Sequence, residues 1–249
     1  MRPLNACLCL FLLSALAVPN THAAVNDSMG VGADFERINR YLDITGPETV
    51  RVRARGNFAG VQGHVQRGAT WRLEGRLLLG TADYRAEGGG GTTENATLIE
   101  GRATFGTQIQ QADRLYAGIA TEAFLGNSPF DENGDISLTS LYVPLGWSSA
   151  RRYADGWRAI MNLELRGYLL GRDEIDGIPG IGDETFHRRG GAGAAFSVRF
   201  QSTDAPVEIE PYIYWSDLAR SASEQVNDTI ARTENASRGG AGLRVKWLF

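Results

Sequence analysis

Apolar and polar side chains alternate with a period of two over most of the chain. Side chains that alternate in this way lie on opposite faces of a β-strand, so each such segment predicts a strand with one apolar face and one polar face. The last nine residues, 241–249, show the pattern clearly, because Leu243, Val245, Trp247 and Phe249 share an apolar face. The opposite face of this segment is cationic.

Nine segments show this alternation clearly enough to predict strands, and they are 54–66, 69–84, 99–109, 114–125, 140–148, 157–172, 196–201, 207–215 and 241–249. The connections between them are short near residues 67, 111, 152 and 204, and long near residues 90, 131, 180 and 228. Short turns at one end and long loops at the other are typical of up-and-down barrels in outer membranes. The pattern therefore predicts an all-β fold, a closed antiparallel transmembrane β-barrel.

The strand number follows from parity. A single-chain bacterial barrel has an even number of strands, so a tenth strand is expected beside the nine clear ones. The segment 31–42 is the best candidate, although Phe35, Ile38 and Leu42 also share a helical face and the segment alternates poorly. This interpretation makes 43–53 the first outer loop. Eight strands is the alternative, if two of the predicted strands merge.

The amino terminus has the composition of an export signal. Arg2 precedes an apolar run that is too short for a membrane-spanning helix, which needs ~20 residues, and small residues follow it. We expect a signal peptide over 1–23, cleavage after Ala23 or Ala24, and a barrel domain over 24–249. Both cysteines of the chain lie in the signal. The expected localisation is the outer membrane, where only a closed barrel satisfies the backbone of a chain without apolar helices.

Four stretches carry a family resemblance: T-W-R-L-E-G-R (70–76), S-L-Y-V-P-L-G-W (140–147), V-E-I-E-P-Y-I-Y-W (207–215) and G-L-R-V-K-W-L-F (242–249). From about Gly56 to Phe249 the chain resembles small porin-like outer-membrane β-barrel proteins of Gram-negative bacteria, a poorly characterised group. The closing strand resembles the signal read by the barrel assembly machinery, which implies that role for Leu243, Val245, Trp247 and Phe249. The implied partners are this machinery, outer-membrane lipid and lipopolysaccharide, and no catalytic residue is implied.

Tryptophan placement agrees with this topology. Trp71, Trp147, Trp157 and Trp247 fall near the periplasmic ends of their predicted strands, and Trp215 falls toward an outer end. Tryptophan is enriched at the two interfaces of a membrane, where its amphipathic ring meets the headgroups. We therefore expect two aromatic girdles.

The polar faces of the predicted strands point into the lumen. They carry ten cations and six anions, which are Arg72, Arg76, Arg102, Arg114, Arg158, Arg166, Arg172, Arg199, Arg244 and Lys246, with Glu74, Glu100, Glu122, Glu164, Glu208 and Glu210. A barrel of about 8 strands has room for little more than its own side chains, and ten strands enclose slightly more. One hypothesis is an ion-pair network that fills a closed, structural or surface-binding barrel. The other is a narrow channel whose arginine surplus favours anions.

Enzymatic chemistry is the remaining alternative, as an outer-membrane hydrolase. Only His64 and His187 remain after signal removal, and neither has a convincing Ser or Asp partner in the sequence. Asp131, Asn133 and Asp135 resemble the start of a calcium loop, but the later bidentate Glu is missing. We therefore expect no enzyme activity, no metal and no cofactor. The formal net charge of −4 gives no reason to expect nucleic-acid binding.

Overall fold

The computed structural model describes residues 28–46, 49–68, 70–86, 91–109, 112–131, 134–152, 156–202, 204–226 and 229–249. The predicted signal peptide lies outside the described residues. Ten antiparallel strands form a closed barrel, which confirms the predicted fold class and strand number. The barrel strands are β1 (Ser28–Thr45), β2 (Thr49–Arg67), β3 (Trp71–Ala86), β4 (Gly91–Gln108), β5 (Asp113–Asn127), β6 (Asp135–Arg152), β7 (Trp157–Ile178), β9 (Gly191–Ser202), β10 (Val207–Leu218) and β12 (Thr229–Leu248).

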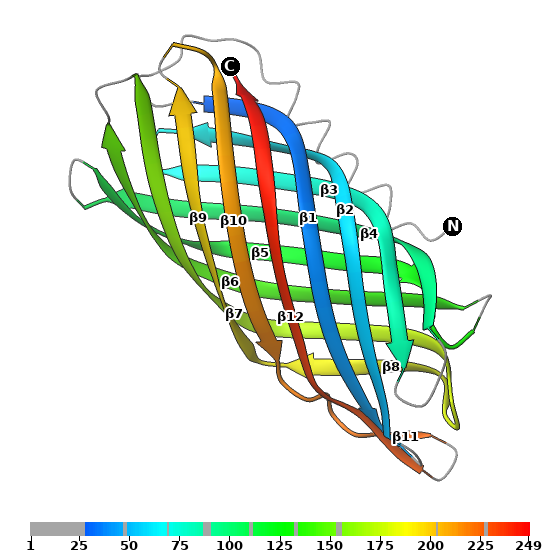
Figure 1. Ribbon diagram of the computed structural model, residues 1–249. Helices are drawn as coiled ribbons and strands as arrows, with labels where there is room; N and C mark the ends of the chain where they lie inside the picture. Colours follow the sequence, from blue (N-terminus) through cyan, green and yellow to red (C-terminus); the bar gives the residue numbers. More distant parts are fainter. Residues whose placement is uncertain are drawn as a thin grey trace.

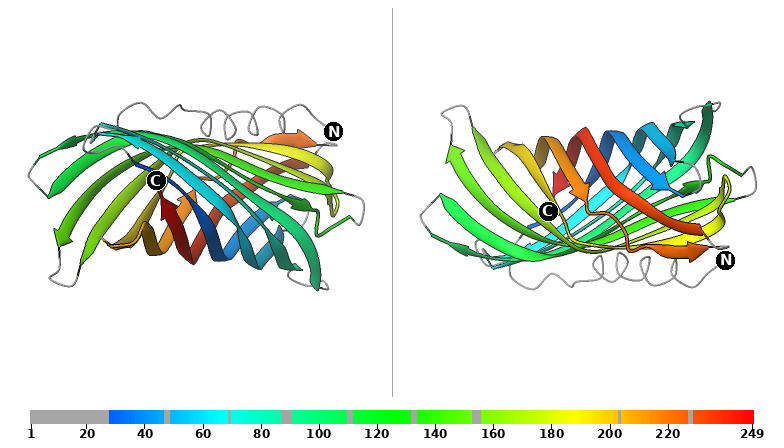
Figure 2. Two further views of the ribbon diagram at one scale, coloured as in Figure 1. Left: turned by 90° about the horizontal axis from the view of Figure 1, so that it is seen from above. Right: turned by 90° about the horizontal axis from the view of Figure 1, so that it is seen from below.

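The first and last strands close the barrel. β1 pairs with β12 in a ladder that runs from Gly30 opposite Leu248 to Thr45 opposite Arg232. Figure 1 shows the two strands side by side in blue and red, and Figure 2 shows the sheet curving round on itself. The segment 31–42 is therefore a strand, because both of its edges pair with neighbouring strands over its whole length.

Several strands are much longer than a membrane requires. A transmembrane β-strand needs about 9–11 residues, whereas β7 has 22, β12 has 20 and β1 has 18. The extra length lies at the end of the barrel opposite to Phe249, which we call the outer end. The end that carries Phe249 and the short turns is the inner end.

The two faces of the sheet exchange their polarity partway along the strands. Near the inner end of β1 the outward side chains are apolar, as with Phe35, which is 52% exposed. Further out, Ile38 and Leu42 point inward and are buried, while Arg37 points outward. We call the outer, inverted part the collar. It consists of 37–45, 49–57, 80–86, 91–97, 124–127, 135–140, 171–178, 182–189 and 229–236.

Below the collar, the outer surface of the barrel is a belt of large exposed apolar side chains. Examples are Val61, Leu79, Leu145 and Leu165, each more than half exposed. A surface of this kind is stable in hydrocarbon and unfavourable in water. The tryptophans lie at the strand positions predicted for them, with Trp215 nearest the collar. In the described part of the chain, no helix has the length and the apolar character needed to cross a bilayer.

The outer connections differ from the prediction. Residues 43–53 are not a loop, because β1 and β2 extend to Thr45 and from Thr49. The segment 174–187 is also not a loop, since β7 continues to Ile178 and turns back as β8 (Gly182–Arg189). Most of 222–234 belongs to β11 (Glu224–Val226) and β12. These segments pair backbone groups that loops would leave to water.

Bulges interrupt the regular pairing. Between β6 and β7 the register shifts at Leu141 and Tyr142, so that Leu169 is the extra residue on β7. A proline in mid-strand is expected at a bulge or break. Pro144 on β6 nevertheless pairs in register with Arg166, so the irregularity lies a few residues away from the proline.

Arg188 closes the collar above the short strands β9 and β10. Its buried guanidinium donates to the carbonyl oxygens of Ala219 at 3.0 Å and Glu234 at 2.7 Å, and it pairs with Asp173. Burial raises the pKa of the Asp173 carboxyl, and the charge of Arg188 opposes that shift. One side chain therefore links β7, β8 and β12 where the barrel wall is shortest.

Candidate functional site in the lumen

The sequence-predicted lumen residues lie inside the barrel with one exception. The inward-facing set is Arg72, Glu74, Arg76, Glu100, Arg102, Arg114, Glu122, Arg158, Glu164, Arg166, Arg199, Glu208, Glu210, Arg244 and Lys246. The prediction for Arg172 is wrong, because the extra residue at Leu169 shifts the alternation by one. Arg172 points outward, has a side chain that is 55% exposed and pairs with Glu174 at 2.5 Å.

Arg76 on β3 is the centre of the luminal network. Its Nε donates to Glu100 at 2.8 Å, and one terminal nitrogen lies 3.3 Å from Asp34 and also pairs with Glu36. The same nitrogen is 3.1 Å from the hydroxyl of Tyr212. Arg76 is 7% exposed, so three carboxylates on two strands share contacts with one buried cation.

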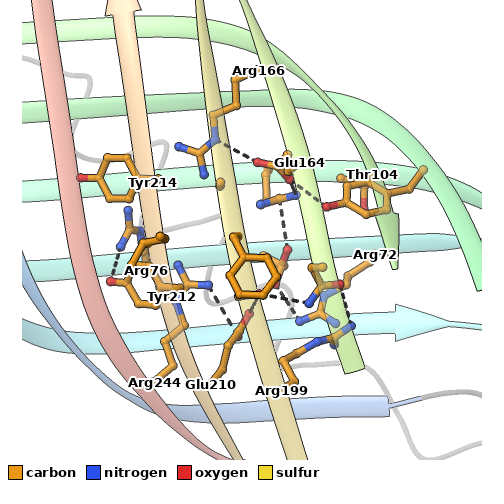
Figure 3. Close-up of a pocket in the computed structure, with 18 of the residues that line it drawn as sticks. Arg72, Arg76, Thr104, Glu164, Arg166, Arg199, Glu210, Tyr212, Tyr214 and Arg244 are labelled. Carbon is orange, nitrogen blue, oxygen red and sulfur yellow. Dashed lines mark hydrogen bonds and ion pairs between the residues drawn. The ribbon is translucent and has the colours of Figure 1, made fainter. Parts of the chain in front are cut away.

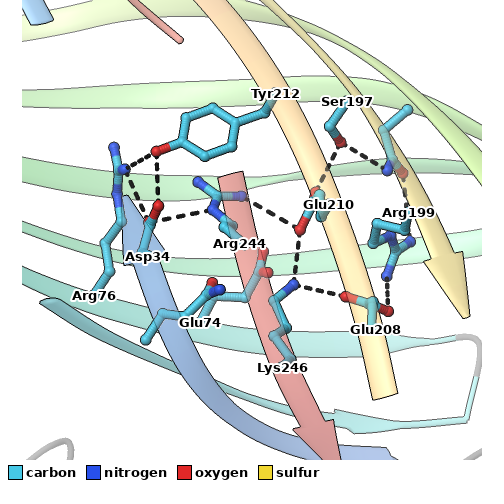
Figure 4. A network of polar contacts seen from close by, with 12 residues as sticks. Asp34, Glu74, Arg76, Ser197, Arg199, Glu208, Glu210, Tyr212, Arg244 and Lys246 are labelled. Carbon is cyan, nitrogen blue, oxygen red and sulfur yellow. Dashed lines mark hydrogen bonds and ion pairs between the residues drawn. The ribbon is translucent and has the colours of Figure 1, made fainter. Parts of the chain in front are cut away.

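A second cluster lies toward the inner end, beside the junction of β1 and β12 (Figure 4). Arg244 is 3.3 Å from Asp34 and 3.6 Å from Glu210. Lys246 donates to Glu208 at 2.8 Å and to Glu210 at 2.7 Å. The alternation that makes 241–249 cationic on one face therefore places both cations against carboxylates.

A third cluster fills the opposite wall. Glu164 accepts from Arg166 at 2.9 Å and from the hydroxyl of Tyr116 at 3.0 Å, and it also pairs with Arg102. Arg102 reaches Glu74 at 3.1 Å, and Glu74 accepts from Arg72 at 2.7 Å. Two carboxylates are thus shared by three arginines.

The prediction missed several luminal charges, among them Asp34, Glu36, Arg40 and Arg238. Asp34 and Glu36 lie on β1, where the change of polarity along the strand hides the alternation. Arg238 precedes the segment in which the final strand was recognised, and it pairs with Glu122 and bonds the hydroxyl of Tyr168 at 3.0 Å. Arg40 lies over the ring of Phe124 at 4.3 Å.

Glycines on neighbouring strands let the luminal tyrosines lie flat against the wall. Tyr214 is opposite Gly240, and a Cβ atom on that glycine would lie 2.5 Å from the tyrosine ring. Tyr116 has the same relation to Gly146, where the distance would be 2.1 Å. An aromatic ring that covers a glycine on the next strand stabilises a curved sheet and fixes the ring in place. Tyr214 is thereby held with its hydroxyl on Glu36.

The outer part of the lumen is apolar. Buried side chains from β1 to β8 and β12 form one continuous cluster inside the collar, which we call the seal and which includes Ile38, Leu42, Ile44, Val50, Val52, Phe58, Leu78, Leu98, Phe124, Ile136, Ile175, Ile178, Ile181 and Phe186. Ile44, Leu78, Ile175 and Phe186 have no exposed surface. The lumen is therefore polar and charged toward the inner end and densely apolar toward the outer end.

The polar half contains a small cavity of about 70 Å³. Seven arginines and three glutamates are among its lining residues, and Figure 3 shows Arg72, Arg199 and Arg244 directed toward it. Asn162 and Ser197 also line the cavity, and the side-chain amide of Asn162 donates to the hydroxyl of Ser197 at 3.1 Å.

The structure describes two histidines, His64 and His187. His64 is buried in the lumen near the inner end, as predicted, and the described residues offer its Nδ1 no partner. His187 is exposed on the outward face of β8, opposite Arg172. In the segments that the structure describes, no group of three or more ligating side chains is arranged to hold a metal ion. Asn133 of the calcium-like stretch lies outside the described residues.

No protein-family model matches the sequence, and no curated protein matches it. Solved structures share its shape at low identity. The outer membrane protease OmpT from Escherichia coli has a TM-score of 0.54 at 10% identity, over 92% of this chain and 99% of that one. The translocator domain of the autotransporter NalP from Neisseria meningitidis has a TM-score of 0.42 at 11% identity, over 98% and 95%.

An outer membrane channel from Pseudomonas putida F1 has a TM-score of 0.33 at 12% identity, over 94% of this chain and 100% of that one. These proteins have different activities, so the likeness concerns the fold alone. With the closed ten-stranded sheet and the exposed apolar belt, the comparison with OmpT shows that this chain has the fold of an outer-membrane β-barrel.

Proposed function

We propose that the protein is an integral outer-membrane barrel that does not conduct ions and that acts through its collar. The observation that carries this proposal is the seal, which brings buried apolar side chains from nine strands together across the outer lumen. An ion would have to leave its water shell to pass such a region, and apolar constrictions of this kind stop conduction by excluding water.

The polar half of the lumen supports the same conclusion. Each of its eight carboxylates, Asp34, Glu36, Glu74, Glu100, Glu122, Glu164, Glu208 and Glu210, contacts at least one arginine or lysine. Charges that bind each other across the lumen fill it and support the wall. The surplus of arginines favours the anion-selective channel as the second candidate, but that candidate requires the seal to open.

Conductance is the direct test. The refolded barrel, inserted in a planar bilayer under a salt gradient, is expected to give no steady current. Folding is verified independently by the changed electrophoretic mobility of unheated protein, and a conducting porin added afterwards verifies that the bilayer accepts barrels. Steady current with a reversal potential on the anion side would contradict the closed barrel and support the channel.

The outward charges of the collar differ between its two sides. On β1 to β3 the outward side chains include Arg37, Arg51, Arg53, Arg55 and Arg85, with Asp43 and Asp83 between them. On β6 to β8 they are mixed and include Asp135, Glu174 and Asp183 together with Arg172 and Arg189. The basic side begins one row of residues above the apolar belt, because Phe35 and Arg37 are successive outward positions on β1. We propose that this side binds the phosphates of lipopolysaccharide, which lie at that height in the outer leaflet.

The double variant Arg55→Gln/Arg85→Gln is expected to weaken binding of lipopolysaccharide about 10- to 30-fold, because each basic side chain near an anionic membrane surface contributes about 1 kcal/mol. The measurement is titration of the detergent-solubilised protein with lipopolysaccharide and with its dephosphorylated form. Arg172→Gln/Arg189→Gln is the matched control, since these exposed arginines lie on the other side of the collar, among outward carboxylates. Equal losses in the two double variants would remove the basic side as the binding surface.

Two further proposals concern enzymatic activity and recognition by the assembly machinery. We propose no enzymatic role, because Nδ1 of His64 is buried without a hydrogen-bond partner among the described residues and His187 lies on the outward face of the collar. The outward positions of Leu243, Val245, Trp247 and Phe249 at the inner end suit recognition by the assembly machinery, which remains a proposal from sequence.

A further inference from the structure

Arginines outnumber carboxylates by seven to three among the residues that line the luminal cavity. Arg76, Arg102, Arg166 and Arg244 each have a carboxylate oxygen within 3.3 Å. Arg199 is different, because its nearest carboxylate, Glu208, is 4.0 Å away and is already bound by Lys246 at 2.8 Å. Arg199 therefore brings a buried positive charge to the cavity without a close counter-charge.

Some guanidinium nitrogens at the cavity also have no hydrogen-bond partner among the described residues. Nε of Arg72 and Nε of Arg199 are both buried, and no described residue accepts from either. Arg72 is 6% exposed, and its contact with Glu74 uses a terminal nitrogen. Buried N–H groups are almost always satisfied by protein, water or a ligand, so these two indicate that something else occupies the cavity.

The charges around these nitrogens favour an anion over water. Arg114 also lines the cavity, close enough to both Arg72 and Arg199 for the charges to repel. Repulsion among neighbouring guanidinium groups is relieved when an anion lies between them. Arg199 is held in place by Asn162, whose side-chain oxygen is 3.4 Å from a terminal nitrogen, so the fork is oriented before an anion arrives.

We propose that this cavity binds a small tetrahedral oxyanion, of the class of inorganic phosphate or sulfate, between Arg72, Arg114 and Arg199. The planar donor fork of arginine fits the oxygen pairs of such ions, which makes it the preferred residue for them. The cavity of about 70 Å³ has space for roughly five water molecules. That space suits a free ion, whereas the barrel wall excludes a lipid that carries the same group.

The ion enters from the inner end. The seal blocks the outer end, and both apolar clusters of buried residues found in the described chain lie toward that side. At the inner end Arg114 and Arg158 are only partly buried and present positive charge to the solvent. The site therefore samples the periplasm, and it requires no conduction through the barrel.

Isothermal titration of the refolded barrel with inorganic phosphate, at constant ionic strength in chloride, tests the proposal. We expect saturable binding in wild type and at least a tenfold loss of affinity in Arg199→Gln and in Arg72→Gln. Arg189→Gln, an exposed collar variant, is expected to bind as wild type does. Because a luminal variant can fail to fold, phosphate is also expected to raise the unfolding temperature of wild type above that in chloride alone.

Absence of saturable binding of both phosphate and sulfate to the folded wild type would overturn the site. Wild-type affinity in folded Arg199→Gln would overturn the assignment of its residues. Conductance of the same preparation reports separately on whether the barrel is closed, so the two proposals fail independently.

Discussion

Replacing Arg76 with methionine is expected to lower the free energy of unfolding by about 3–5 kcal/mol, because a buried ionic cluster that loses one partner retains uncompensated charges. Asp34, Glu36 and Glu100 all contact this side chain inside the barrel. The measurement is urea unfolding of the refolded protein in detergent micelles, followed by tryptophan fluorescence and by electrophoretic mobility.

Arg85→Met is the control on the same strand, since Arg85 is exposed on the collar. Such a surface change is expected to stay within about 0.5 kcal/mol. Similar small effects of Arg76→Met and Arg85→Met would mean that water, rather than Arg76, satisfies the three carboxylates. The polar half of the lumen would then be hydrated, and the case for a filled barrel would be lost.

Replacing Phe124 with alanine is expected to cost about 3–5 kcal/mol of stability, as a large-to-small change does in a close-packed core. Phe124 is 2% exposed, packs edge-to-face against Phe58 at 6.2 Å and lies under the guanidinium of Arg40. The variant leaves a void beside Arg40 and removes its ring partner. Unfolding in urea, as for Arg76, measures the loss.

Phe105→Ala is the matched control, because Phe105 is 64% exposed on the apolar belt and no void forms when it is shortened. We expect a clearly smaller loss there. A nearly neutral Phe124→Ala would mean that the collar contains water instead of an apolar core. It would also reopen the channel hypothesis, since the seal is the observation against conduction.

Strand alternation in the sequence was enough to predict the barrel, the strand number and the inward direction of most luminal charges. The prediction succeeded where the same face of a strand stays apolar across the whole membrane. On β3, for example, Trp71, Leu73 and Leu79 all face outward. It failed at Arg172, because a single extra residue on the strand reverses every later side chain and leaves no signal in the composition.

The collar could not be predicted in the same way. On β1 and β2 the apolar side chains point outward within the membrane and inward in the collar. The alternation of apolar and polar positions, counted over a whole strand, therefore shows no consistent apolar face. Val50, Val52 and Ala54 are buried inside, while Ala59 and Val61 on the same strand face outward. Segments 43–53 and 174–187 looked like loops for this reason. The inward direction of Asp34 and Glu36 was missed because the first strand alternates poorly.

The luminal network also depends on distant parts of the chain, which no local pattern contains. Asp34 meets Arg244, and Glu36 meets Tyr214, across sequence separations of 210 and 178 residues. Only the register of a closed sheet brings these side chains together, so the sequence predicted which charges point inward and not which of them pair.

The junction of β1 and β12 has a consequence for how the barrel is completed. Asp34 and Glu36 are covered by β10 and β12 when the barrel closes. Arg244 and Tyr212 then contact Asp34, and Tyr214 contacts Glu36. A β12 that paired one residue out of step with β1 would turn Arg244 toward lipid and remove it from Asp34. The charged side chains of the first strand therefore favour one register with the last strand over the neighbouring registers.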